Sequence, residues 1–160
     1  MRFPLPLVAW LLLPAFLHGQ NGTQSETKQT HPPIANEETS VRKELVGTWR
    51  GYAVEGAGEK PNQGPVKLEL TITETEISAI KDGKQDMGAG AYHLDLGQSP
   101  AWLEGNRTRG AGPKGPYLGI FKFDGDTLKW CVANPHYPRP TEFRTVKGQF
   151  LLILKRAEKK

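Results

Sequence analysis

The 160-residue chain carries 21 basic and 17 acidic side chains, for a formal net charge of +4. No basic stripe interleaved with aromatic residues accompanies this small surplus, which argues against nucleic-acid binding. With 37% hydrophobic residues, 18 Gly and 13 Pro, the composition favours a turn-rich β domain over a helical bundle. A chain of this length predicts one folded domain, and its single cysteine, Cys131, excludes an internal disulfide.

The N-terminus predicts export. Met1-Arg2 is followed by an apolar run from residue 3 to residue 17. This run is shorter than the roughly 20 residues that a helix needs to cross about 30 Å of hydrocarbon. We interpret residues 1–19 as a secretory signal peptide, with an uncleaved anchor as the alternative. The mature protein is then periplasmic, on the cell surface or secreted, with no transmembrane span.

Residues 20–40 are mostly polar and predict a disordered linker, because they offer too little apolar surface to offset the entropy of ordering. The folded domain then extends over residues 41–160. It can begin with a short helical turn at residues 41–43, before the first strand, and no longer helix is predicted within it.

Strand signals recur through this domain. From Val66 to Ile72 apolar and polar residues alternate, as in a half-buried strand. Asp82-Gly83 predicts a tight hairpin turn with positive φ at both central residues. The segment Lys84–Asp95 contains glycines that indicate a bend or bulge. A second hairpin is predicted around Asp124-Gly125-Asp126.

The first predicted strand is Glu44–Val54, with Leu45 and Trp49 pointing inward and Tyr52 as a further candidate, and the last ends at Arg156. About eight short strands at regular spacing are typical of an antiparallel sandwich or barrel. The fold class that we predict is all-β, an antiparallel up-and-down barrel of about eight strands. An eight-stranded barrel encloses its own side chains or one small ligand.

Several motifs occur in an order that resembles a known family. They are Val46-Gly47-Thr48-Trp49, Tyr92-His93-Leu94-Asp95, Gly119-Ile120-Phe121, Asp124-Gly125-Asp126-Thr127-Leu128-Lys129-Trp130-Cys131, Arg139-Pro140-Thr141-Glu142-Phe143 and Leu154-Lys155-Arg156. Together they resemble the uncharacterised lipocalin-like domain family that is abundant in planctomycete bacteria. The chain departs from the family pattern at His136-Tyr137-Pro138, where family members usually have a Pro-Gly turn.

The resemblance implies a lipocalin-like barrel that is usually exported, and it supplies no reaction, substrate or cofactor. It also implies that Trp49 and Arg156 seal one end of the barrel, with the Arg156 guanidinium over the indole. Such a cation–π contact contributes about 0.5–2 kcal/mol. The role of this pair is therefore structural.

The candidate ligand-binding residues leave two interpretations open. Arg139 lies in a proline-rich loop, where it either faces an anionic ligand at the barrel rim or clamps the loop by bonding backbone carbonyls. Four bulky aromatic residues either contact a ligand or fill the barrel, because a register slip of one residue inverts which face of a strand points inward. These four residues are Tyr92, Trp102, Trp130 and Phe121.

We expect no catalytic residue, metal or cofactor. The histidines have no recognised metal-ligand spacing, and nothing in the sequence around Cys131 predicts an activated thiolate. The favoured function is an exported lipocalin-like module that binds a small apolar or amphipathic molecule in the barrel or at its rim, where a protein partner is also possible. The alternative is a structural or protein-interaction domain with a barrel filled by its own side chains.

Overall fold

The structure, a computed structural model, describes residues 34–55 and 66–158. The predicted signal peptide and residues 20–33 of the predicted linker lie outside the described residues. The elements, in chain order, are α1 (Ile34–Leu45), β1 (Gly47–Glu55), β2 (Val66–Ile72), β3 (Glu76–Lys81), β4 (Gln85–Asp95), β5 (Trp102–Arg107), β6 (Gly115–Tyr117), β7 (Gly119–Asp124), β8 (Thr127–Ala133) and β9 (Gln149–Arg156).

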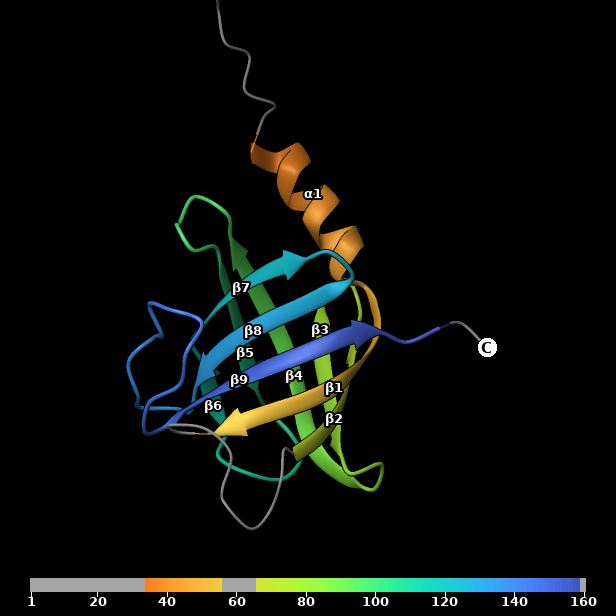
Figure 1. The fold of residues 1–160 in the computed structure, drawn as a ribbon, viewed down its shortest axis with the longest axis vertical. Helices are drawn as coiled ribbons and strands as arrows, with labels where there is room; N and C mark the ends of the chain where they lie inside the picture. The colour runs from red at the N-terminus through yellow and green to blue at the C-terminus, as the bar shows by residue number, and fades with distance from the viewer. Residues whose placement is uncertain (1–33, 56–65, 159–160) are drawn as a thin grey trace, which may run out of the picture. The chain divides into compact units, whose positions relative to one another are not determined.

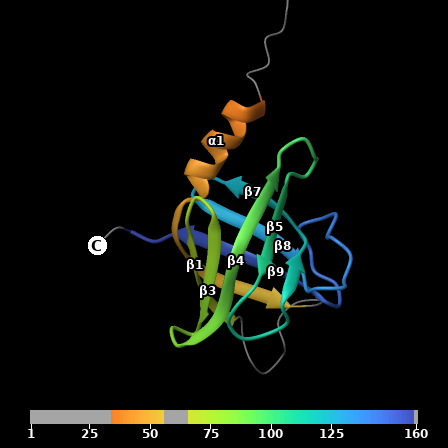
Figure 2. The same cartoon turned by 180° about the vertical axis from the view of Figure 1, so that it is seen from behind.

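The strands form one antiparallel sheet that closes on itself (Figure 1). Strands β1 to β4 pair in sequence, as do β7 to β9, and the β4–β5 and β1–β9 pairings complete the ring (Figure 2). The short strands β6 and β7 both pair with β5 and are separated by Leu118, so they are two pieces of one barrel strand. The barrel therefore has eight strands in up-and-down order, and the predicted lipocalin-like fold class is confirmed.

The predicted turns are present because their residues allow the backbone angles that the turns need. Asp82 and Gly83 have φ values of 51° and 69°, so the β3–β4 hairpin has the two positive values predicted for it. On the β3 side of this turn, the β3–β4 register shifts between Ala79 and Ile80. Gly88, with φ of 103°, lies opposite this shift and is the bulge glycine that the sequence predicts.

Helix α1 corrects the linker prediction, which is wrong for residues 34–40. Within the helix Arg42 pairs with Glu38 one turn earlier, at 2.8 Å. Its guanidinium also donates to the Glu74 carbonyl at 3.0 Å and lies 4.8 Å from the centre of the Tyr92 ring. Tertiary contacts of this kind stabilise a helix of 12 residues, which is too short to be stable alone in water.

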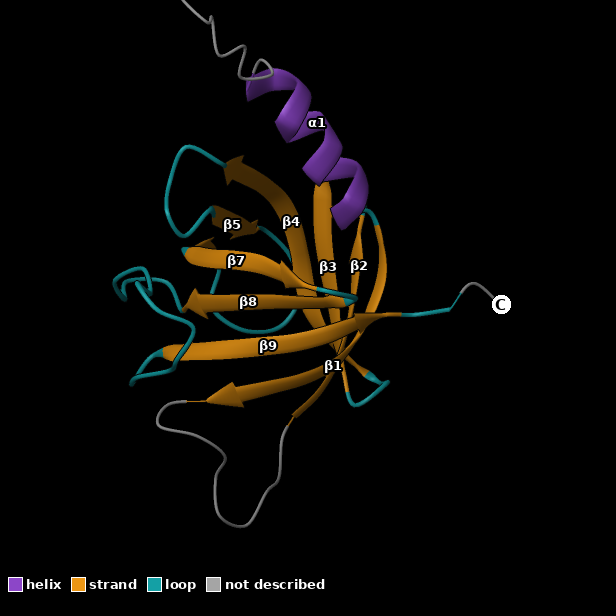
Figure 3. Ribbon diagram, turned by 45° about the horizontal axis from the view of Figure 1, so that its top comes forward, coloured by secondary structure: helices purple, strands orange, loops and turns teal. Residues whose placement is uncertain are grey.

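Trp49, near the start of β1, and Arg156, at the end of β9, are register partners. Helix α1 leads into β1 at this end of the barrel (Figure 3). The guanidinium carbon of Arg156 is 4.4 Å from the indole centre, so the predicted contact is present. The indole N–H donates to the Leu45 carbonyl at 2.8 Å, and Arg156 donates to the carbonyls of Val46, at 2.8 Å, and Glu44. The pair thus also binds carbonyls at the C-terminus of α1, where the helix supplies no partners of its own.

The half of the barrel next to α1 is filled by the chain's own side chains. Trp49 is only 2% exposed and packs with its ring centre 6.0 Å from that of Phe123. The other buried side chains of this half are Leu45, Ile72, Tyr92, Leu94, Leu103, Phe121, Leu128 and Leu154. None of these residues lines the cavity that the other half of the barrel contains.

Candidate ligand cavity

A cavity of ≈ 230 Å³ occupies the other half of the barrel. Its walls come from β1 to β6, β8 and β9, at the barrel end opposite α1 (Figure 3). Most of the lining is aliphatic or aromatic, from Val66, Leu68, Leu70, Ile77, Tyr117, Trp130, Val132, Phe150 and Leu152.

Trp130 forms the inner wall of the cavity and separates it from the filled half. The indole is 7% exposed, and its N–H donates to the Leu103 carbonyl at 3.0 Å, so the only polar group of the side chain is satisfied. Two inward-facing glycines make room for the ring. A Cβ at Gly105 would lie 3.6 Å from the indole, and one at Gly119 would collide with its nitrogen.

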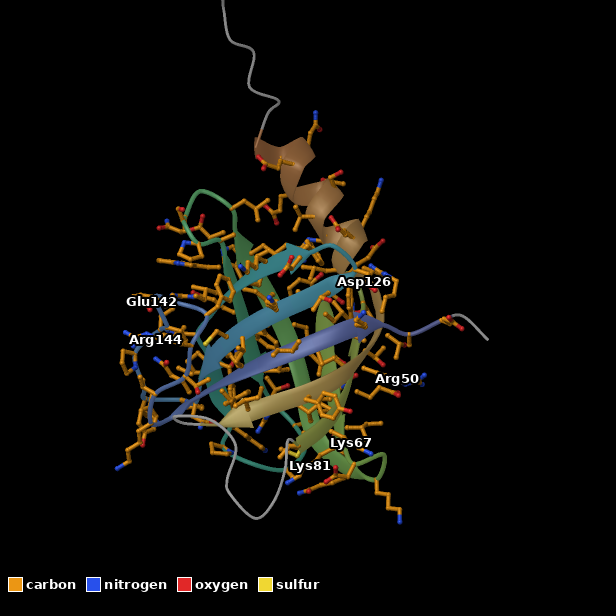
Figure 4. All side chains as sticks on the ribbon, in the orientation of Figure 1. Arg50, Lys67, Lys81, Asp126, Glu142 and Arg144 are labelled. Atoms are coloured by element: carbon orange, nitrogen blue, oxygen red, sulfur yellow. The ribbon has the colours of Figure 1, made fainter. Side chains whose placement is uncertain are left out.

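Two cationic side chains, Arg107 and Lys81, line the cavity, and no described lining residue is an aspartate or glutamate. The guanidinium of Arg107 is held by a hydrogen bond to the Ala111 carbonyl at 3.0 Å and lies 4.4 Å from the centre of the Tyr117 ring. Lys81 lies at the barrel end away from α1, whereas Asp126 lies near α1 (Figure 4). The ionised side chains among the described lining residues are therefore both cationic.

The Tyr117 phenol is neutral at physiological pH. Burial raises the pKa of Tyr117 above its ordinary value of 10.0, and the charge of Arg107 offsets only part of that effect. Its hydroxyl donates to the Pro113 carbonyl at 2.8 Å. Tyr117 therefore offers Arg107 an aromatic face without a compensating negative charge.

The structure brings only one of the predicted ligand-binding residues, Trp130, to the cavity. Tyr92 and Phe121 point inward but lie in the filled half. The Tyr92 hydroxyl donates to the Thr73 carbonyl at 3.0 Å, and the ring of Phe121 meets that of Phe123 edge to face at 6.1 Å. For Tyr92 and Phe121 the cavity gives the predicted ligand role no support.

Trp102 and Arg139 lie outside the cavity as well, on the outer face of the barrel. The Arg139 guanidinium stacks on the Trp102 ring at 3.8 Å, donates to the Gly119 carbonyl at 2.8 Å and forms an ion pair with Glu104. Each contact ties the loop after β8 to the barrel wall. Of the two interpretations of Arg139, the geometry favours the loop clamp over a ligand-facing donor.

The sequence reasoning missed Arg107, Lys81 and Tyr117 as cavity residues. Arg107 is the last residue of β5, so its inward position depends on how far that strand extends. Lys81 is the residue before the predicted Asp82-Gly83 turn. The turn could have identified Lys81 as a residue at the barrel rim, because a residue next to a hairpin turn lies at the end of its strand.

The loop of residues 134–148 covers a small second core on the outer face of β7 and β8. Residues 134–148 form no strand. Cys131, with 0% exposure, lies under this loop beside Ile120 and Ala133, and its thiol donates to the Arg144 carbonyl at 3.4 Å. Burial raises the pKa of Cys131 from its ordinary 9.0 to about 11, as expected of a structural and unreactive thiol.

This thiol gives a pH-dependent prediction. The folded-state pKa of Cys131, about 11, lies above the unfolded value of 9.0. The contribution of the thiol to the free energy of unfolding is therefore complete below pH 9 and is lost as pH rises towards 11. Chemical denaturation at several pH values should show this fall in the free energy of unfolding as a difference from Cys131→Ala. Identical slopes in the two proteins, or rapid alkylation of the native thiol by iodoacetamide at pH 8, would contradict the assignment.

In the described part of the chain, no three His, Cys, Asp or Glu side chains gather closely enough to hold a metal ion. Over the same residues, no helix combines the length and hydrophobicity that a membrane span requires. No family model matches the chain, and no curated protein or solved structure matches it either.

Proposed function

We propose that the chain is an exported lipocalin-like binding module, not an enzyme, that takes up a small apolar or amphipathic molecule in the open half of its barrel. The observation that carries the proposal is the cavity of ≈ 230 Å³ with its largely apolar lining. It exceeds the roughly 150 Å³ of an engineered apolar cavity that binds benzene. It is smaller than the roughly 300–1,000 Å³ of drug-sized sites, so we expect a small ligand.

Two sequence features support the rest of the proposal. The apolar run at the N-terminus supports export. The ordered motifs from Gly47-Thr48-Trp49 to Leu154-Lys155-Arg156 support membership of the lipocalin-like family, and the contact between Trp49 and Arg156 is the one that the family resemblance implies.

The competing function is a protein-interaction domain, and one observation favours it. Tyr52 and Ile153 are paired neighbours on the outer face of β1 and β9, and both are large and exposed, at 46% and 39%. Val146, at 50%, is a further exposed hydrophobic residue in the loop before β9. Scattered apolar residues are common on protein surfaces, so these weigh less than a largely apolar cavity inside the barrel.

Native mass spectrometry of the mature protein, purified from its host's exported fraction, tests the proposal. We expect a discrete extra mass that leaves on denaturation, or a one-to-one adduct when fatty acids and isoprenoids are added. A bare mass under both conditions would contradict ligand binding and favour the interaction domain.

A further inference from the structure

We infer that the molecule bound in the cavity is an amphipathic anion, with its anionic head on Arg107 and Lys81 at the mouth and its apolar tail against Trp130. The inference rests on the proposed function and adds the chemical class of the ligand. Its basis is the distribution of charge in the cavity. Both ionised groups among the described lining residues are cations, and all other described lining side chains are neutral.

The position of Arg107 within the barrel is fixed by its strand. Every second residue of β5 points to the inner face of the barrel. Leu103 lies in the filled half, Gly105 lies against the indole of Trp130, and Arg107 lies at the mouth of the cavity. The aliphatic part of Arg107 lies over Gly88 of β4, where a Cβ would be 3.0 Å from the Arg107 Cδ. A Cβ at position 88 would collide first with the Arg109 carbonyl, so glycine allows the close approach of β4 to the segment that carries Arg107.

The guanidinium of Arg107 is held in advance of binding. One of its five N–H groups is used by the Ala111 carbonyl, and one face lies against Tyr117. No described carboxylate forms an ion pair with Arg107 or Lys81, in contrast to Arg109, which pairs with Glu76 outside the cavity. The remaining N–H groups match the two oxygens of a carboxylate, which arginine binds with two parallel hydrogen bonds.

The size of the cavity sets the length of the tail. At about 30 Å³ for each non-hydrogen atom, the volume of one water in the liquid, a cavity of ≈ 230 Å³ holds roughly eight such atoms. The seven tail carbons of an eight-carbon fatty acid fit this space, with the carboxylate at the mouth and the methyl end near Trp130. Octanoate and octanol, which have the same chain and differ in head-group charge, are therefore suitable probes.

The test is a calorimetric titration of the mature protein with each probe. We expect octanoate to bind at least about tenfold more tightly than octanol, since a hydrogen bond to a charged group is worth more than that factor. Added salt should weaken octanoate binding and leave octanol binding unchanged. Arg107→Gln should remove the preference for octanoate and retain octanol binding, whereas Arg109→Gln, the matched control outside the cavity, should leave both affinities unchanged.

Each outcome separates this inference from the function on which it rests. Equal, salt-independent binding of octanoate and octanol by the natural protein would overturn the anionic class and leave a neutral-ligand cavity in place. Binding of neither probe, or of any molecule in the mass-spectrometry panel, would overturn the cavity function as well. The comparison of the two probes needs no variant, so it remains decisive if Arg107→Gln does not fold.

Discussion

Trp49→Ala is expected to lower the free energy of unfolding by about 3–5 kcal/mol, the range for removing a buried tryptophan from a packed core. The indole is 2% exposed, packs near Phe123 and donates its N–H to Leu45. The variant loses this volume, leaves the Leu45 carbonyl without its partner and removes the ring beneath Arg156. Chemical denaturation followed by circular dichroism would measure the loss.

A matched control lies on the same strand. Tyr52 is an aromatic residue of β1 that is 46% exposed on the outer face, so Tyr52→Ala should change the free energy of unfolding much less. An unfolding midpoint for Trp49→Ala within error of that for Tyr52→Ala would contradict the role of Trp49 at the filled end.

Truncation after Lys147 should abolish cooperative folding. It removes β9, which closes the barrel by pairing with both β1 and β8 over most of its length. Without it two strands expose their backbone hydrogen-bonding groups, and the core loses Leu152 and Leu154. Thermal unfolding followed by near-ultraviolet circular dichroism should show no sigmoidal transition.

Truncation after Ala157 is the control for this experiment. It keeps β9 and the hydrogen bond from the Ala157 N–H to the Thr48 carbonyl at 2.8 Å. This protein should unfold with the midpoint of the full domain. A cooperative transition in the shorter protein that ends at Lys147 would refute the closed topology.

The elements that could be predicted are those whose signals are local. Alternation from Val66 to Ile72, the Asp82-Gly83 turn and the hairpin at Asp124 each depend on residues that are neighbours in sequence. The Trp49–Arg156 contact spans the whole domain, and it was reached through the family resemblance. The number of strands could be predicted from the spacing of such signals. Their regular spacing along the domain also favoured an antiparallel barrel or sandwich.

The features that could not be predicted depend on residues far apart in sequence. Helix α1 is held by contacts between Arg42 and residues of the barrel. Arg139 and Trp102 meet because the loop after β8 folds back over β5 on the outer face. Tyr92 and Phe121 do point inward, but the sequence does not tell which half of the barrel is filled and which is hollow. Arg107 is the last residue of β5, so its place on the inner face is known only once the end of that strand is known.

The central claim is that the open half of the barrel is a binding cavity, and one parallel measurement tests it most directly. Ala79 of β3 lines the cavity, so Ala79→Leu adds volume inside it without touching the filled half. Native mass spectra of the natural protein and of Ala79→Leu, each mixed with octanoate, should show a one-to-one adduct for the natural protein and a strongly reduced one for the variant. Equal adducts in both proteins, or no adduct in either with octanoate or any molecule of the panel, would contradict the cavity as the binding site.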